Sequence, residues 1–194
     1  MTRPGPSPRD PSLLRTEERV RVRPALPSDR VGMAQVHVET WKTTYRGLVP
    51  DARLDQMTVD RDLEGGFGRW LTDPPPGHRA FVGVSDEVGV VGFAVAHPEV
   101  GHDPVFTGEL GAIYVLQGWQ GQGIGRRLVG SVARHLRSTG HSAMLVWVLE
   151  GNPFRRFYEK LGGEILRREL RPTAGTKLPE LAYGWRELRA LMEL

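Results

Sequence analysis

The feature that most constrains the fold of this chain is a glycine-rich turn, residues 120–125, that separates two segments of different periodicity. Residues 109–115 before it alternate as a β-strand does, and apolar residues recur at helical spacing from Gly123 onward. Glycine lets a bound group approach the main chain closely, and the first amides of a helix have no partners within the helix. The turn therefore predicts an anion site, built of main-chain nitrogens, for a phosphate or pyrophosphate.

Three classes of phosphate-binding turn compete for this stretch. A P-loop requires Lys followed by Ser or Thr after its last glycine, but Arg126 and Arg127 stand there. A dinucleotide fingerprint requires the pattern G-x-G-x-x-G. In the register that starts at Gly121 the third glycine is replaced by Arg126, and in the register that starts at Gly123 it is replaced by Leu128. Neither class fits.

The third class fits. The pattern Gln120-x-x-Gly123-x-Gly125 resembles the Q/R-x-x-G-x-G/A signature with which the GNAT superfamily of N-acetyltransferases holds the pyrophosphate of acetyl-CoA. A second stretch, residues 152–162, is similar to the family's motif N-x-x-x-x-F-Y-x-K-x-G-F, with Gly163 in place of the final aromatic residue. The likeness extends over about residues 88–169. It implies that acetyl-CoA is the co-substrate.

The order of strand and helix signals along the chain agrees with this resemblance. In the first half of the chain we predict a strand at 19–24, helices at 27–45 and 51–71, and strands at 78–85, 88–97 and 109–115. In the second half we predict a helix from 123 that ends at Gly140, a strand at 143–148 and a helix at 152–162. Strands at 163–170 and 182–188 and a short helical tail complete the chain. With the resemblance, this order implies an α/β (α+β) architecture, the GNAT fold: a mixed, twisted sheet of about six to seven strands flanked by about four helices. Residues 1–18, rich in Pro and Arg, are predicted to be a disordered tail before a single domain, residues 19–194.

Composition excludes several other classes of protein. The chain has 194 residues, a net charge of +3 and three lysines, so it lacks the concentrated basic stripe expected of a nucleic-acid-binding protein. It has no cysteine, which excludes disulfides, thiolate zinc sites and a cysteine acyl-enzyme. The longest apolar run, residues 143–149, is too short to cross a membrane, and the amino terminus lacks the apolar core of a signal peptide. We therefore expect no membrane partner and a cytoplasmic location.

The resemblance also implies which residues hold the coenzyme. In the family the sheet splays open beside the turn, and the pantetheine arm pairs with free strand amides there. The residues expected to bind acetyl-CoA are Ile113, Tyr114, Val115, Gln120, Gly121, Gln122, Gly123, Ile124, Gly125, Arg126 and Asn152. Asn152 is also a good helix N-cap, and that role alone accounts for it.

Acetyl transfer to an amine needs a base that removes a proton and an acid that protonates the leaving thiolate. Tyr158 matches the motif tyrosine that faces the coenzyme sulfur in the family, so it is the expected acid; packing among aromatic neighbours is the alternative. Glu109 is the expected base, because a glutamate at this place is the base in some family members, whereas others use water chains. Strict alternation would put Glu109 on the same face as Ile113 and Val115. A solvated charge at a strand end is the alternative for Glu109.

Two further groups of side chains invite a functional interpretation. Trp41 and Tyr45, spaced i,i+4, could line the acceptor pocket that the first helices cover in the family, or they could be an aromatic pair in the core. His97, His102 and Asp103 carry atoms that bind metals, but their spacing has no order and they surround a Pro- and Gly-bearing loop. We predict a surface loop there and no metal site.

These observations lead to one leading function. The chain is expected to be an acetyl-CoA-dependent N-acetyltransferase that moves an acetyl group to a primary amine of a small molecule or peptide, by direct transfer in a ternary complex. A non-catalytic acyl-CoA-binding sensor module is the main alternative, and a dinucleotide-binding oxidoreductase is a distant third. The acceptor cannot be identified from the sequence because acceptor pockets in this family come from variable loops. A homodimer stays open, since dimers are common among relatives.

Overall fold

The protein's computed structural model describes residues 20–67 and 74–194, and the tail predicted for residues 1–18 lies outside them. The strands are β1 (Val20–Pro24), β2 (Arg79–Ser85), β3 (Gly89–Pro98), β4 (Gly108–Val115), β5 (Met144–Leu149), β6 (Glu164–Thr173) and β7 (Thr176–Trp185). The helices are α2 (Arg30–Thr44), α3 (Asp51–Asp55), α4 (Val59–Asp62), α6 (Ile124–Ser138), α7 (Arg156–Lys160) and α8 (Arg189–Met192), with short helical turns η2 (Pro27–Asp29), η3 (Leu63–Phe67) and η4 (Gln117–Trp119).

The described strands form a seven-stranded sheet in the order β1-β2-β3-β4-β5-β7-β6. Neighbouring strands are antiparallel except for β4 and β5, which are parallel. Their connection runs through the glycine-rich turn and α6, as a parallel crossover requires. β5 is a nearly continuous apolar run inside the sheet, and its residues pack on both faces of the sheet. The predicted mixed sheet is therefore confirmed.

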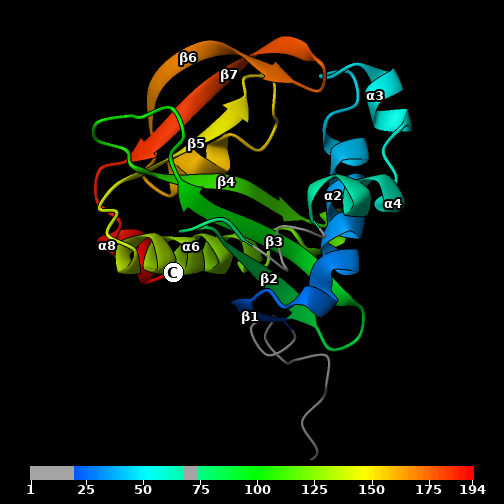
Figure 1. The fold of residues 1–194 in the computed structure, drawn as a ribbon, viewed down its shortest axis with the longest axis horizontal. Coiled ribbons are helices and arrows are strands. Elements are labelled where there is room, and N and C mark those ends of the chain that lie inside the picture. The colour runs from blue at the N-terminus through cyan, green and yellow to red at the C-terminus, as the bar shows by residue number, and fades with distance from the viewer. Residues whose placement is uncertain (1–19, 68–73) are drawn as a thin grey trace, which may run out of the picture.

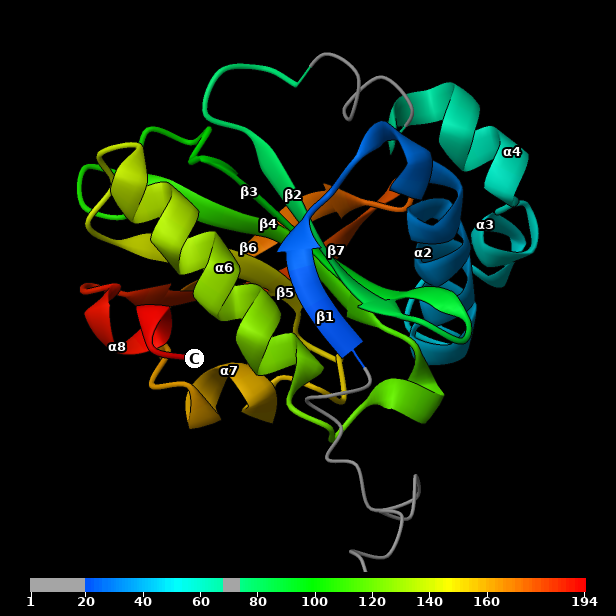
Figure 2. The ribbon, with the colours of Figure 1, turned by 90° about the horizontal axis from the view of Figure 1, so that it is seen from below.

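Helices cover the two faces of the sheet unequally. α6 lies across one face, with α7 and α8 beside it, and α2, α3 and α4 are grouped on the other side (Figure 2). α6 buries a stripe of apolar residues at helical spacing: Ile124, Leu128, Val129, Val132, Ala133 and Leu136. α2 covers β2, β3 and β4 through Met33 and Val36. Its Val38 packs in a second cluster that includes Leu149 of β5 and Leu178 of β7. The part of this face that lies beyond β4 is formed by β5, β6 and β7, which lie together at the top of Figure 1.

The start of α2 is held in place by Asp29, which lies at the N-cap position. Asp29 does not cap the helix through its side chain; instead its buried carboxylate accepts a hydrogen bond from the Leu26 N–H at 2.7 Å and forms an ion pair with Arg23 at 2.6 Å. Asp29 thus ties the helix start back to β1. Of the apolar residues along α2, Val31 is exposed, whereas Ala34 and Val38 are buried.

The helical segment predicted over residues 51–71 is not continuous, and its last residues lie outside the described part of the chain. The first helix, α3, ends at Asp55, and Thr58 is the N-cap of the next helix, α4. Its hydroxyl accepts a hydrogen bond from the Arg61 N–H at 3.3 Å at the start of α4. A hydrogen-bond contact between His37 Nδ1 and Asp62 Oδ2, 2.5 Å long, holds α4 against α2.

The last two strands form a long hairpin that the sequence only partly predicted. β7 begins at Thr176 rather than at residue 182 and ends at Trp185 rather than at 188. The turn consists of Ala174 and Gly175, both with positive φ (54° and 83°), which is the two-residue turn that matches strand twist. Pro172 made this hairpin hard to predict, because a proline within a strand-like run of residues normally argues against a paired strand.

Candidate active site

A split between the two central strands is the main opening in the sheet. β4 and β5 pair only at Gly108 with Met144 and at Glu109 with Leu145, and they diverge beyond those residues. A cavity of about 390 Å³ occupies the region where they diverge. Its lining comes from α2, from the ends of β4 and of the β5–α7 connection, from the glycine-rich turn and from α7.

The glycine-rich turn presents unpaired main-chain nitrogens to this cavity. Gly121 and Gly123 have positive φ (74° and 78°), a conformation that favours glycine. The Gln120 side chain donates a hydrogen bond to the Val115 carbonyl at 3.0 Å and so ties the turn to the strand. None of the backbone N–H groups of residues 121–126 donates a hydrogen bond within the described part of the chain. Together with the positive end of the 15-residue α6, they fit a pyrophosphate.

Almost all residues predicted to bind the coenzyme line the cavity. Gln122 does not, because its side chain turns back and donates a hydrogen bond to the Gly118 carbonyl at 3.1 Å. The predicted residues in the lining are Ile113, Tyr114, Val115, Gln120, Gly121, Gly123, Ile124, Gly125, Arg126 and Asn152. The lining also includes side chains that the sequence analysis did not single out: Thr40, Thr44, Trp119, Phe154 and Phe157. The i,i+4 spacing of Thr40 and Thr44, one residue before Trp41 and Tyr45, was a signal for the first two.

Asn152 joins the two sides of the cavity. Its side-chain oxygen accepts a hydrogen bond from the Phe154 N–H at 2.8 Å, which stabilises the turn before α7. Its side-chain nitrogen donates to the Tyr45 hydroxyl on α2 at 3.2 Å. The predicted helix therefore begins later than expected, at Arg156, and Asn152 acts on the preceding turn. The buried amide fixes Tyr45 at the cavity wall.

Of the two predicted acceptor residues, only Tyr45 lines the cavity. Trp41 lies behind it: the two rings are 4.9 Å apart, and the Trp41 indole N–H donates a hydrogen bond to the Tyr114 hydroxyl at 3.0 Å. Burial raises the pKa of Tyr114 to about 12, so its hydroxyl stays protonated at neutral pH. Trp41 thus contacts Tyr45 and Tyr114, two tyrosines of the lining, but does not itself line the cavity.

Tyr158 is buried at the opposite side of the cavity. Its ring stacks on Tyr183 with a centroid distance of 5.6 Å and contacts Trp185 edge-on at 6.4 Å. Burial, together with Tyr114 and Tyr183, raises the pKa of Tyr158 well above its usual range. The side chain is therefore a neutral phenol over the whole physiological range, a state in which it can donate a proton.

A β-bulge interrupts β4 next to Glu109. Leu110 pairs with Ala96 of β3, and Ala112 pairs with the next residue, Val95, so Gly111 is the extra residue. The His97 ring lies over this position, because a Cβ on Gly111 would stand 2.2 Å from its Nε2 atom. A residue with a side chain cannot occupy the bulge without moving that ring.

Because of the bulge, Glu109 lies on the opposite face of the sheet from the one predicted. Leu110 packs in the same cluster as Ile113 and Val115, on the α6 side of the sheet. Because neighbouring residues alternate, Glu109 lies on the other face, the α2 side, with Tyr114. Strict alternation from Val115 was wrong because one extra residue in a strand reverses the alternation. Glu109 and Tyr158 consequently belong to opposite sides of the split.

The carboxyl group of Glu109 is poised to exchange a proton near neutrality. Burial raises its pKa to about 7; the neighbouring charges of Glu99 and Glu180 add to the rise, and Arg171 opposes it. Its Oε2 atom is buried and has no hydrogen-bond partner among the residues described. Glu109 does not line the cavity but lies at its closed end, where β4 and β5 still pair. Glu180 and Arg171 were not anticipated from the sequence.

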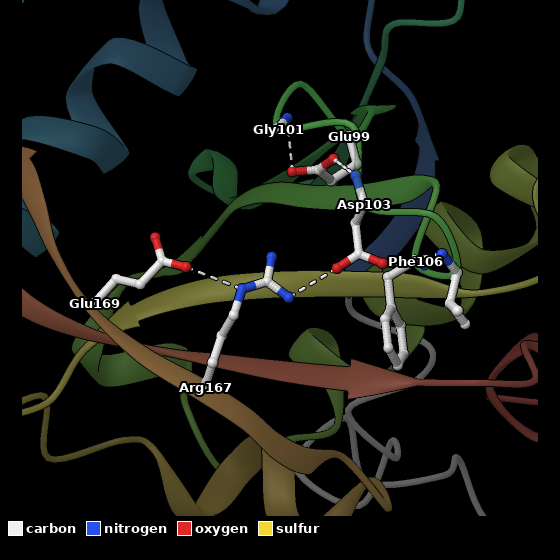
Figure 3. A network of polar contacts seen from close by, with 7 residues as sticks. Glu99, Gly101, Asp103, Phe106, Arg167 and Glu169 are labelled. Atoms are coloured by element: carbon white, nitrogen blue, oxygen red, sulfur yellow. Dashed lines mark hydrogen bonds and ion pairs between the residues drawn. The ribbon is translucent and has the colours of Figure 1, made fainter.

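The loop between β3 and β4, predicted to be a surface connection, is organised by polar contacts (Figure 3). The Glu99 carboxylate accepts hydrogen bonds from the N–H groups of Gly101 and Asp103, and Asp103 accepts from Val105 and Phe106. No group of side chains that could hold a metal ion occurs among the described residues. Within the same residues, no helix combines the length and the apolar character needed to span a membrane.

Comparisons with known proteins agree with this geometry. The family of FR47-like proteins matches residues 96–171. The protein described as the uncharacterized N-acetyltransferase YuaI of Bacillus subtilis (strain 168) is 35% identical over 175 residues, which cover 90% of this chain and 98% of that protein.

Solved structures of low sequence identity share the fold. The PaiA N-acetyltransferase of Thermoplasma acidophilum, in complex with coenzyme A, has a TM-score of 0.63 at 17% identity over 84% of this chain and 97% of that one. The structure of YncA from Salmonella typhimurium, described with its cofactor acetyl-CoA, has a TM-score of 0.63 at 20% identity over 87% of this chain and 94% of that one. The predicted fold and the predicted co-substrate are confirmed. By its relationship to YuaI over nearly its whole length, and by its fold, this chain belongs to the GNAT superfamily of N-acetyltransferases, whose acyl donor is acetyl-CoA.

Proposed function

We propose that this enzyme acetylates a primary amine of a small molecule or peptide by direct transfer, with the donor and the acceptor bound together. The observation that carries the proposal is the split between β4 and β5. It has unpaired main-chain nitrogens at one end, the Tyr158 phenol on the α6 side and Glu109 on the α2 side. Donor and acceptor can therefore meet from opposite faces of one sheet. The absence of cysteine from the chain removes the commonest covalent carrier of an acyl group.

The donor end of the site would be held by main-chain groups. The N–H groups of residues 121–126 and the Arg126 side chain would bind the negative charge of the pyrophosphate. Past Glu109 the edge of β4 pairs with no strand on its β5 side within residues 20–67 and 74–194, and Ile113 and Val115 would pair there with the pantetheine arm. When bound, the coenzyme supplies a thioester whose carbonyl carbon is open to attack by an amine.

The reaction needs one proton removed and one returned. In the proposal, the acceptor amine loses a proton to the Glu109 carboxylate, directly or through water, and the Tyr158 hydroxyl donates a proton to the departing sulfur. The raised pKa of Glu109, about 7, is suited to a base that must release its proton again at neutral pH. Tyr45, fixed by Asn152, would form the wall against which the acceptor lies, and Trp41 would support it.

Three measurements test the proposal. A panel of amines is screened for release of coenzyme A thiol and for acetylated product, and we expect turnover with at least one class of primary amine. Mass spectrometry after incubation with acetyl-CoA alone should detect no acetylated protein, and initial rates should fit a sequential mechanism. Binding of acetyl-CoA without turnover on any amine would favour the sensor interpretation, and an acetylated protein intermediate would contradict direct transfer.

Replacing Tyr158 with phenylalanine should lower kcat about 10- to 100-fold, because the departing sulfur loses its proton donor. The dissociation constant of acetyl-CoA, measured by calorimetry, should change less than about threefold, since the ring and its packing are kept. Tyr183→Phe is the matched control: its ring stacks on Tyr158, but its hydroxyl donates a hydrogen bond to Glu159 at 2.9 Å. Equal turnover of the Tyr158→Phe and native enzymes would remove Tyr158 from the mechanism.

A further inference from the structure

The α2 side of the sheet beyond the split carries an aromatic ring with two guanidinium groups against it. The ring is that of Trp147 on β5. The guanidinium carbon of Arg171 lies 4.1 Å from the ring centroid and that of Arg167 lies 5.1 Å from it; both arginines come from β6. Arginine stacked on an aromatic face is held in a fixed orientation, which suits recognition of planar anions.

The two arginines differ in how fully they are paired. Arg167 is held between two carboxylates: its Nη1 atom lies 2.7 Å from Asp103, and its Nε atom lies 3.0 Å from Glu169 (Figure 3). Arg171 contacts a single carboxylate, that of Glu180, through its Nε atom at 3.4 Å. Its two Nη groups donate to no side chain or carbonyl in the described ranges 20–67 and 74–194. Arg171 therefore presents the edge of its guanidinium that binds a carboxylate through two parallel hydrogen bonds.

Glu180 keeps Arg171 in this orientation instead of neutralising its free edge. The Glu180 carboxylate is buried and also accepts a hydrogen bond from the Thr173 hydroxyl across the β6–β7 hairpin. The ion pair uses the Nε side of the guanidinium, and the Trp147 ring covers one of its faces. What is left for a ligand is the pair of Nη groups.

This free edge lies close to the proposed base. Glu109 pairs with Leu145 on β5, and Trp147 is two residues further along β5 on the same face of the sheet. The charge of Arg171 is felt at Glu109, whose ionised form it stabilises. Arg171 is thus one of the charged groups that act on the Glu109 carboxyl group, whose buried Oε2 atom has no hydrogen-bond partner among the described residues. Their charges are complementary to a molecule with an amine and an anion a short distance apart.

We propose that the acceptor is an amino acid, whose carboxylate is bound by the Nη groups of Arg171 on the Trp147 ring while its amine lies toward Glu109. This proposal rests on the proposed function and specifies its substrate class. It also gives the ion network of the 99–107 loop a role. By holding Arg167 through Asp103, the loop keeps the second guanidinium against Trp147 and so fixes the ring that supports Arg171.

The test compares amino acids with analogues that lack the carboxylate. L-Alanine, L-methionine and L-glutamate are each assayed beside their α-amides and decarboxylated amines. The assays are run at pH 9, so that Glu109 is ionised in every variant. We expect kcat/KM for the acids to exceed that for the neutral analogues about 10- to 100-fold. Arg171→Gln should remove this preference by raising KM for the acids and should leave the amides within about threefold of native.

Three further measurements support the assignment. Arg171→Lys keeps the positive charge but cannot form two parallel hydrogen bonds to a carboxylate, so it should recover only part of the preference for acids over their neutral analogues. Arg168→Gln is the matched control, because Arg168 faces the other side of β6 and pairs with Glu150 at 2.9 Å; it should behave as native. Calorimetric titration of the preferred amino acid into protein saturated with coenzyme A should show binding in the native protein and none in Arg171→Gln.

The outcomes separate this proposal from the one it rests on. If amides or plain amines are acetylated as well as the acids, or if Arg171→Gln slows acids and amides equally, the carboxylate site is wrong and the amine acetyltransferase stands. If acetyl-CoA binds but no amine is acetylated, the proposed function and this inference are both wrong.

Discussion

Replacing Gly123 with aspartate is expected to weaken acetyl-CoA binding about 100-fold or more, whereas asparagine at the same position weakens it less than about 10-fold. Gly123 has a φ of 78° and lines the cavity, and a Cβ there would meet no atom within 4 Å. Both side chains therefore fit sterically, and Asn and Asp tolerate positive φ better than other residues. A carboxylate about 5 Å from a phosphate costs about 3 kcal/mol at an effective dielectric constant of about 20, which is about 100-fold in affinity.

The difference between the two variants isolates charge from backbone strain. Both carry the same strain, so calorimetry with acetyl-CoA at low and high salt measures the electrostatic term, which should shrink as salt is added. Thermal unfolding without ligand should be nearly the same for both. If aspartate and asparagine weaken binding equally, or if neither does, the main-chain nitrogens of this turn do not hold the pyrophosphate.

The donor half of the site could be predicted from sequence because it is contiguous. β4, the turn and α6 follow one another without interruption, and each is specified by local periodicity and by glycines such as Gly121 and Gly123. The amides at the start of a helix need no distant partner to point outward. The direction of the Gln122 side chain could not be predicted, because it depends on local packing in the turn, here a hydrogen bond to the Gly118 carbonyl.

The acceptor half could not be predicted because it depends on pairing between distant segments. The bulge at Gly111 exists only in the register of β4 against β3, and it moved Glu109 to the opposite face. The Trp147–Arg171 contact requires β5 and β6 to flank β7, and the sequence analysis had missed the first half of β7. Motifs thus located the coenzyme, and only the sheet topology located the residues around the amine.

Replacing Glu109 with glutamine should lower kcat about 100- to 1000-fold and remove the pH dependence that the native enzyme shows near neutrality. With a pKa of about 7, Glu109 is protonated and inactive as a base below that pH, so native kcat should rise tenfold per pH unit up to about pH 7 and level off above it. The glutamine variant should show a low, flat profile. The KM for acetyl-CoA should change little, because Glu109 lies on the face away from Ile113 and Val115.

The same substitution has an effect on stability that does not depend on catalysis. Between the ordinary carboxyl pKa of 4.5 and the raised value of about 7, the folded protein holds a proton that the unfolded chain has released. Raising the pH through this interval therefore destabilises the native protein, by at most about 3 kcal/mol, and glutamine removes the penalty. Denaturant unfolding should find Glu109→Gln gaining stability relative to native from pH 4 to pH 8, with the exposed Glu164→Gln as an unaffected control. A gain in stability without a loss of kcat would mean that Glu109 is buried as described but that water, not its carboxylate, takes the amine proton. The absence of a relative gain in stability would mean that the carboxyl group is solvated in the folded enzyme.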